Sequence, residues 1–154
     1  MKVAFNIYRI FKGGLYMRKI LVATHGYYAN GIKSSLEILT GIKDNITAIN
    51  AYVNDENIDE KLKAFFETIS VEDEVVVFTD LYGGSVNQKV TALSKDKNIF
   101  IVAGFNLSMV VETFLYVEDL TKDKINELIV ANRNEMRLVD LGVNNEEERN
   151  DFFS

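Results

Sequence analysis

The chain has 154 residues, a formal net charge of −6, no cysteine and one histidine. This length suits one buried core but not two typical α/β domains, and the missing cysteines exclude a disulfide framework. The acidic charge without a basic patch argues against nucleic-acid binding. No apolar run is long enough to span a membrane. One histidine without any cysteine is too few ligands for a zinc site. We therefore expect a cytoplasmic protein that needs no metal or cofactor.

Residues 1–16 are predicted to be an upstream, non-native extension of the domain. Arg9 and Lys12 interrupt the apolar stretch and no small-residue cleavage site follows, so the segment does not resemble a secretory signal. The codons of Lys12-Gly13-Gly14 can form a bacterial ribosome-binding sequence, which places the expected translation start at Met17. The alternative is a short extra helix or arm.

From Met17 onward, strands and helices alternate. Apolar runs without polar alternation are typical of strands buried on both faces, and apolar residues at helical spacing predict amphipathic helices. Strands are expected at 19–24, 47–53, 74–79, 98–103 and 135–141, and helices at 29–42, 58–69, 85–95, 108–116 and 121–132. This order predicts a single α/β domain over 17–143 with a mostly parallel sheet covered on both faces, followed by a flexible acidic tail at 144–154.

His25 is the first candidate functional residue. It ends the apolar run 19–24 and is followed by Gly26 and an amphipathic helix. Ligands of open α/β sheets bind beyond the carboxyl ends of the strands, where a helix amino terminus favours an anion. Imidazole is a nucleophile near neutral pH, so a covalent phosphohistidine suits this position. The alternative is an ordinary packed or surface histidine.

A second strand end carries Asp80. The buried run 74–79 stops at Asp80-Leu81-Tyr82-Gly83-Gly84-Ser85, where the glycines allow close backbone approach to an anion and Ser85 begins the next helix. In a parallel sheet, Asp80 lies at the same edge as His25. The motif by itself is better explained as a helix start with its cap, and Gly104–Ser108 after the next strand as an ordinary turn.

These three segments together resemble a known family. Leu21–Gly26, Thr79–Ser85 and Gly104–Met109 are similar to the three motifs of the mannose-family IIA component of the bacterial sugar phosphotransferase system, in the same order and spacing. The resemblance implies a doubly wound sheet whose last short strand is antiparallel and is exchanged in a homodimer. It also implies that His25 accepts a phosphoryl group from the phosphocarrier HPr, with Asp80 as its partner. The group then passes to a IIB component that serves the membrane IIC and IID transporter.

The residues also favour this chemistry on their own. Attack needs one uncharged ring nitrogen, and a carboxylate bonded to the other nitrogen fixes that tautomer, which is the role expected of Asp80. Donors around the phosphoryl oxygens are expected from the amides near Gly26, Gly83 and Gly84 and from the hydroxyls of Thr79 and Ser85.

Three other functions stay open at this point. One is the phosphoryl-donating subunit of dihydroxyacetone kinase, which shares the fold and also uses an early histidine. Another is a regulatory module in which phosphorylation of His25 reports the sugar supply. A nucleotide- or flavin-binding domain is disfavoured because the chain lacks the glycine-rich loops of those folds.

Overall fold

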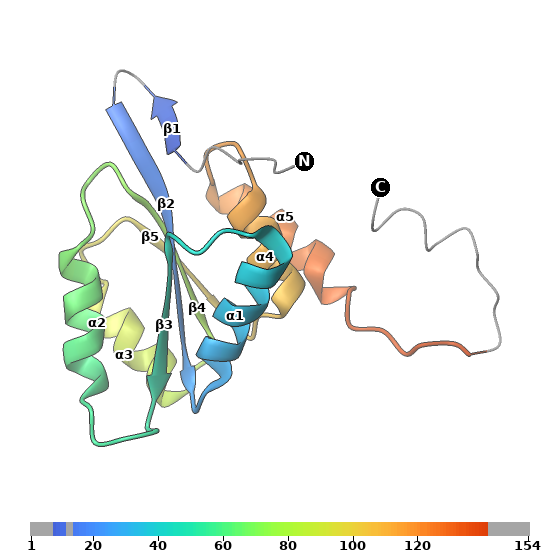
Figure 1. Ribbon diagram of the computed structural model, residues 1–154, viewed down its shortest axis with the longest axis horizontal. Helices are drawn as coiled ribbons and strands as arrows, with labels where there is room; N and C mark the ends of the chain where they lie inside the picture. The colour runs from blue at the N-terminus through green and yellow to red at the C-terminus, as the bar shows by residue number, and fades with distance from the viewer. Residues whose placement is uncertain (1–7, 12–13, 142–154) are drawn as a thin grey trace.

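A four-stranded parallel sheet forms the centre of the protein in the computed structural model, which describes residues 8–11 and 14–141 (Figure 1). The sheet order is β3-β2-β4-β5, and β1 pairs antiparallel with the start of β2. The strands are β1 (Tyr8–Phe11), β2 (Gly14–His25), β3 (Ile46–Ala51), β4 (Glu74–Thr79) and β5 (Ile99–Ala103).

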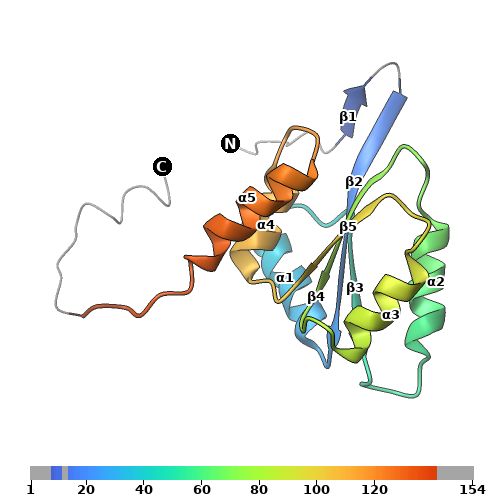
Figure 2. The same cartoon turned by 180° about the vertical axis from the view of Figure 1, so that it is seen from behind.

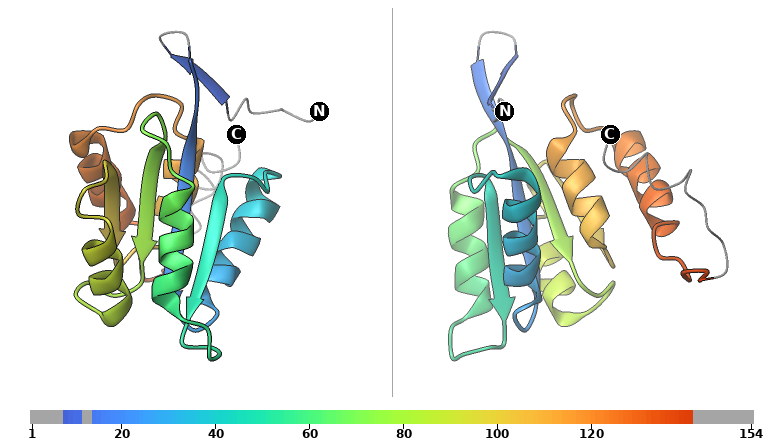
Figure 3. Two further views of the ribbon diagram at one scale, coloured as in Figure 1. Left: turned by 90° about the vertical axis from the view of Figure 1, so that its left-hand side faces the viewer. Right: turned by 45° about the vertical axis from the view of Figure 1, so that its right-hand side comes forward.

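Helices cover both faces of this sheet, as expected from the alternating pattern. One face carries the first helix and the last two, and the other face carries the second and third, as Figures 2 and 3 show from two further sides. The helices are α1 (Tyr28–Thr40), α2 (Ile58–Glu67), α3 (Ser85–Leu93), α4 (Leu107–Leu115) and α5 (Lys122–Arg133). The predicted doubly wound α/β fold is thereby confirmed.

The two central strands have no polar side because each face is buried under helices. In β2, Ile20 and Val22 pack toward α1, α4 and α5, whereas Leu21 and Ala23 pack toward α2 and α3, and all four are fully buried. Alternate residues of a strand point to opposite faces, so a sheet covered twice requires an uninterrupted apolar run. Because β2 and β4 are held side by side and parallel, both strands end at the same edge of the sheet.

The chain order reverses at the middle of the sheet. The chain goes from β2 to β3 on one side through α1, and then crosses the opposite face through α2 to β4 on the other side of β2. The two connections therefore separate where β2 and β4 end, and a ligand crevice forms at such a switch point. His25 ends β2 and Asp80 follows β4 at this edge.

The predicted final strand at 135–141 is wrong for the single chain. Residues 136–140 have no regular secondary structure and lead away from the sheet (Figure 1), and Leu138 and Leu141 are 98% and 95% exposed. A strand needs a neighbour for its backbone hydrogen bonds, and no described strand of the same chain lies beside this segment. The expected tail at 144–154 lies outside the described residues.

Candidate functional site

His25 is held at the end of β2 by contacts that fix the loop leading to α1. The buried Thr24 hydroxyl accepts a hydrogen bond from the Ala29 amide at 2.8 Å. Gly26 has a φ of +61°, a left-handed conformation that costs little only for glycine, and its amide donates to the Ala51 carbonyl at 3.0 Å. The ends of β2 and β3 are thus fastened together, and the His25 ring is 38% exposed beside them.

The structure brings His25 and Asp80 into direct contact. Asp80 Oδ2 lies 2.8 Å from His25 Nδ1 and also accepts the backbone amide of His25 at 2.9 Å. Its other oxygen accepts the Leu81 amide at 3.0 Å, so both oxygens of the carboxyl group are engaged. These three bonds hold the carboxyl group and, through it, the plane of the imidazole ring.

The charge on Asp80 determines which nitrogen of His25 is free. Partial burial raises the pKa of Asp80, but the hydrogen bonds from the backbone and ring of His25 outweigh that effect, so its pKa lies below the ordinary value. An ionised carboxylate only accepts hydrogen bonds, so Nδ1 must carry the hydrogen that it donates to Asp80. In the neutral ring, Nε2 then keeps its lone pair.

The lowered pKa of Asp80 predicts a defined dependence of stability on pH. An acid whose pKa is depressed in the folded state stabilises the fold above its ordinary pKa of about 3.9, and loses that contribution as pH falls through the folded value. We expect the difference in free energy of unfolding between wild type and Asp80→Asn to be largest near neutral pH and to shrink below about pH 4. Urea unfolding at pH 7 and pH 3 measures this, and a difference that grows on acidification would contradict it.

The Nε2 side of the ring faces the beginning of α3. Ser85 Oγ lies 3.1 Å from His25 Nε2. The residue before the helix is Gly84, which has no side chain to cap it, and among the described residues no acceptor is recorded for the amides of Ser85 and Val86. Free N–H groups and the helix dipole make this end of α3 suitable for a phosphate oxygen.

The other predicted phosphate ligands at the end of β4 and in the loop after it, Thr79, Gly83 and Gly84, have hydrogen-bond partners within the chain. The amides of Gly83 and Gly84 already donate to Asn87 Oδ1 and to the Leu81 carbonyl, both at 3.1 Å. A Cβ on Gly84 would lie 3.1 Å from the Leu81 Cβ and 3.8 Å from His25 Cε1, so glycine keeps the loop close to the ring. Thr79 is fully buried, and its hydroxyl accepts from Asn87 at 3.0 Å.

Tyr52 is a member of this site that the sequence analysis missed. Its hydroxyl donates to Ser85 Oγ at 3.0 Å, and its ring lies 5.5 Å from the His25 ring, centroid to centroid. The predicted strand 47–53 included this residue, whereas β3 ends at Ala51. Because His25 and Ala51 are paired in register, the residue after Ala51 lies beside His25, and that pairing was not visible in the sequence.

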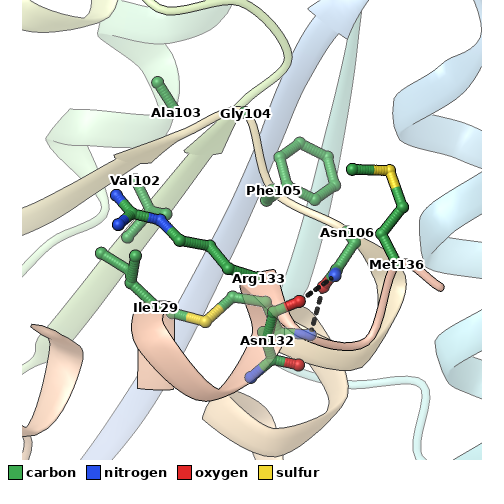
Figure 4. A pocket seen from close by; sticks show the side chains of 10 residues that line it. Val102, Ala103, Gly104, Phe105, Asn106, Ile129, Asn132, Arg133 and Met136 are labelled. Atoms are coloured by element: carbon green, nitrogen blue, oxygen red, sulfur yellow. Dashed lines mark hydrogen bonds between the residues drawn. The ribbon is translucent and has the colours of Figure 1, made fainter. Parts of the chain in front are cut away.

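A separate pocket of about 260 Å³ lies on the α4 and α5 side of β5 (Figure 4). Its lining includes Phe105, Asn106, Asn132 and Arg133, and Asn106 donates to the Asn132 carbonyl at 2.7 Å. None of the predicted site residues lines this pocket. The Gly104–Met109 motif therefore supplies the start of α4, where the Asn106 side chain accepts the Met109 amide at 2.9 Å.

Comparison with known families decides what kind of protein carries this site. Residues 19–130 match the family model EIIA-man, described as the fructose IIA component of the phosphotransferase system. The chain belongs to this family. The matched range contains both His25 and Asp80, and the resemblance inferred from the three motifs is confirmed.

Individual members of the phosphotransferase system show the same similarity. The mannose-specific EIIAB component of Escherichia coli K12 is 30% identical over 104 residues, which are 65% of this chain and 32% of that protein. A crystal structure of the EIIA component from Streptococcus agalactiae has a TM-score of 0.64 and 30% identity, covering 80% of this chain and 97% of that one. The IIA protein associated with the fucose utilization operon of Streptococcus pneumoniae has a TM-score of 0.67 and 27% identity, covering 79% and 92%.

The family assignment makes this IIA chain a component of a sugar phosphotransferase system. The chain spans about a third of the length of the curated relatives it matches. Within the described residues, none of the helices is long and apolar enough to cross a membrane.

Proposed function

We propose that this IIA chain accepts a phosphoryl group on His25 Nε2 and passes it on during sugar uptake. The observation that carries the proposal is the 2.8 Å contact between Asp80 and Nδ1, because it leaves the opposite nitrogen with a free lone pair. That nitrogen faces Ser85 and the open amino end of α3, where phosphoryl oxygens find hydrogen-bond donors.

The transfer balances without any further reactant. The lone pair of Nε2 attacks the phosphorus of a phosphorylated donor, the new N–P bond forms, and the bond from phosphorus to the donor breaks with its electron pair returning to the donor. The Nδ1 hydrogen stays in place, and the ring gains positive charge that the Asp80 carboxylate stabilises. The reverse of this step delivers the group to the next acceptor.

The proposed phosphate ligands are the Ser85 hydroxyl and the first amides of α3. Gly26, Gly83 and Gly84 support the site through their backbone conformation, since their amides donate within the chain. The Thr79 hydroxyl is not among the proposed phosphate contacts, because its side chain is fully buried and accepts a hydrogen bond from Asn87.

The proposed donor is phospho-HPr and the proposed acceptor is a IIB component, which would link the chain indirectly to IIC and IID in the membrane. Both soluble partners must bring a reactive group to Nε2, so they need a surface around His25. The loops beside this residue expose large side chains: Tyr27 is 69% exposed and Tyr82 is 91% exposed. Exposed aromatic groups are common at protein interfaces. The proposed exchange of a phosphoryl group with HPr and IIB would take place in the cytoplasm.

Intact-mass measurement on the wild-type chain tests the proposal. With phosphoenolpyruvate, enzyme I and HPr, we expect the mass of one phosphoryl group, lost after mild acid, and nuclear magnetic resonance should place it on Nε2. Addition of a cognate IIB should remove it. A chain that gains no phosphoryl group would overturn the proposal, and transfer only to a dihydroxyacetone kinase subunit would replace the sugar pathway.

We also propose that two copies pair through residues 135–141. β5 has a free edge among the described strands, and a groove of about 780 Å³ lined partly by Ile101, Val102 and Ala103 lies along it. An unpaired strand edge readily accepts another strand. The exposed apolar side chains Met136, Leu138, Val139 and Leu141 are suited to fill such a groove in a partner.

Removal of the chain after Asn134 should convert the dimer to a monomer, because it deletes the proposed exchanged strand. Analytical ultracentrifugation of both proteins at equal concentration measures this. Leu39→Asp is a suitable control, since Leu39 is 61% exposed on α1 and lies outside the groove. A full-length chain that sediments as a monomer would contradict the pairing.

A further inference from the structure

Tyr52 completes a line of hydrogen bonds that runs through the site. Its hydroxyl is 3.0 Å from Ser85 Oγ, which is 3.1 Å from His25 Nε2, and His25 Nδ1 is 2.8 Å from Asp80. Three separate strand ends therefore contribute to one chain of contacts. Tyr52 follows β3, His25 ends β2, Asp80 follows β4, and Ser85 begins α3.

The direction of these bonds follows from the chemistry of the groups. Nδ1 donates to the Asp80 carboxylate, so Nε2 has to accept, and the hydrogen between His25 and Ser85 belongs to the serine hydroxyl. The Ser85 oxygen is then available to accept the phenol hydrogen of Tyr52. If Tyr52 withdrew, the serine hydroxyl would be free to turn its hydrogen away from Nε2.

The backbone of Tyr52 adopts an unfavourable conformation. Its φ is +63°, in the left-handed region, where a bulky aromatic residue is uncommon and the backbone is strained. Such strain persists only where surrounding contacts impose it, and it is concentrated at functional sites. Here the adjacent Ala51 is fastened to both His25 and Gly26, and the turn that follows holds the phenol against the ring of His25.

We propose that Tyr52 is a positioning residue for phosphoryl transfer at His25. Its hydroxyl orients Ser85 so that the serine hydrogen stays directed at the Nε2 lone pair. This inference rests on the proposed function and adds a residue to it. Ser85 Oγ occupies the side of Nε2 that phosphorus must approach, so the serine has to swing aside during transfer. The two hydroxyls then become donors to the phosphoryl oxygens, which stabilises the transferred group.

The first test uses the unphosphorylated protein. Because the chain contains one histidine, ¹⁵N spectra report the ring nitrogens of His25 without overlap. We expect Tyr52→Phe to weaken the hydrogen bond from Ser85 to Nε2, and so to move the Nε2 resonance toward that of a free, unprotonated nitrogen at a pH where the ring is neutral. Tyr116→Phe is the matched control, since Tyr116 follows α4 and its hydroxyl donates to Glu118.

The second test measures the rate of phosphoryl uptake from phospho-HPr. Loss of one donor to a charged group predicts a rate about 10- to 100-fold lower in Tyr52→Phe, with the control unchanged. The urea midpoint should stay at its wild-type value, because the 56% exposed side chain keeps its ring and only a surface hydroxyl is removed.

The outcomes separate this inference from the proposed function. A wild-type uptake rate in Tyr52→Phe, or ring-nitrogen resonances that do not move, would overturn the role of Tyr52. Equal slowing in Tyr116→Phe would overturn it as well. If the wild-type chain takes up no phosphoryl group, the proposed function fails, while the ring-nitrogen comparison still decides whether Tyr52 orients Ser85.

Discussion

His25→Ala is expected to abolish phosphoryl uptake completely. His25 carries the only imidazole of the chain, and no other residue can form an acid-labile phosphohistidine. The assay is intact mass after incubation with phosphoenolpyruvate, enzyme I and HPr, read before and after mild acid. The wild-type chain should gain one acid-labile group and the variant none.

His25→Gln provides the control for shape and hydrogen bonding. Glutamine keeps a polar side chain at the end of β2 but has no nucleophilic nitrogen, so it should also remain unmodified. Urea unfolding of both variants shows whether the fold survives without the contact to Asp80. An acid-labile adduct on His25→Ala would place the phosphoryl group elsewhere and contradict the assignment.

Asp80→Asn should slow phosphoryl transfer by about 10²- to 10⁴-fold without abolishing the nucleophile. The amide carries no charge to stabilise the ring as it becomes cationic, and its NH₂ group favours the wrong tautomer when it faces Nδ1. Rapid-quench measurement of uptake from phospho-HPr gives the rate. The final yield of phosphorylated protein should change less than the rate.

Asp73→Asn is a matched control for this variant. Asp73 is also a partly buried aspartate. Burial raises its pKa, but the hydrogen bonds from Lys19 and Ser70 outweigh that effect, so its pKa lies below the ordinary value. It pairs with Lys19 at 2.6 Å, near the start of β4 and far along the strands from His25. Its loss should leave the transfer rate near that of wild type, and similar slowing in both variants would remove the specific role of Asp80.

The strands that carry the site were predictable because uninterrupted apolar runs in the sequence indicate strands buried on both faces. Val75, Val76 and Val77 form an apolar run that suits a strand covered on both faces, and the Asp80 segment ends it abruptly. The placement of His25 and Asp80 at one edge followed from the parallel order of the sheet alone. Their direct contact was expected from chemistry and is present at 2.8 Å.

The structure departs from what the sequence suggested where a segment depends on distant partners. The strand predicted over 135–141 has suitable residues, but within the single chain it has no neighbour that could bond its backbone. Thr79 was expected to contact phosphate, yet its side chain points into the protein, where Asn87 bonds it. Both outcomes depend on which surfaces meet after folding.

The sequence by itself determined the order of strands and helices from β2 to α5, the buried character of the central strands and the edge at which His25 and Asp80 meet. These features follow from apolar periodicity and from the parallel sheet that such periodicity requires. Only the tertiary structure decided that Tyr52 turns left-handed beside His25, that Ser85 faces Nε2 and that β5 keeps a free edge. Pairing of the strands brings residues about 30 and 60 positions apart into contact with His25. Local sequence patterns do not determine the register in which the strands pair.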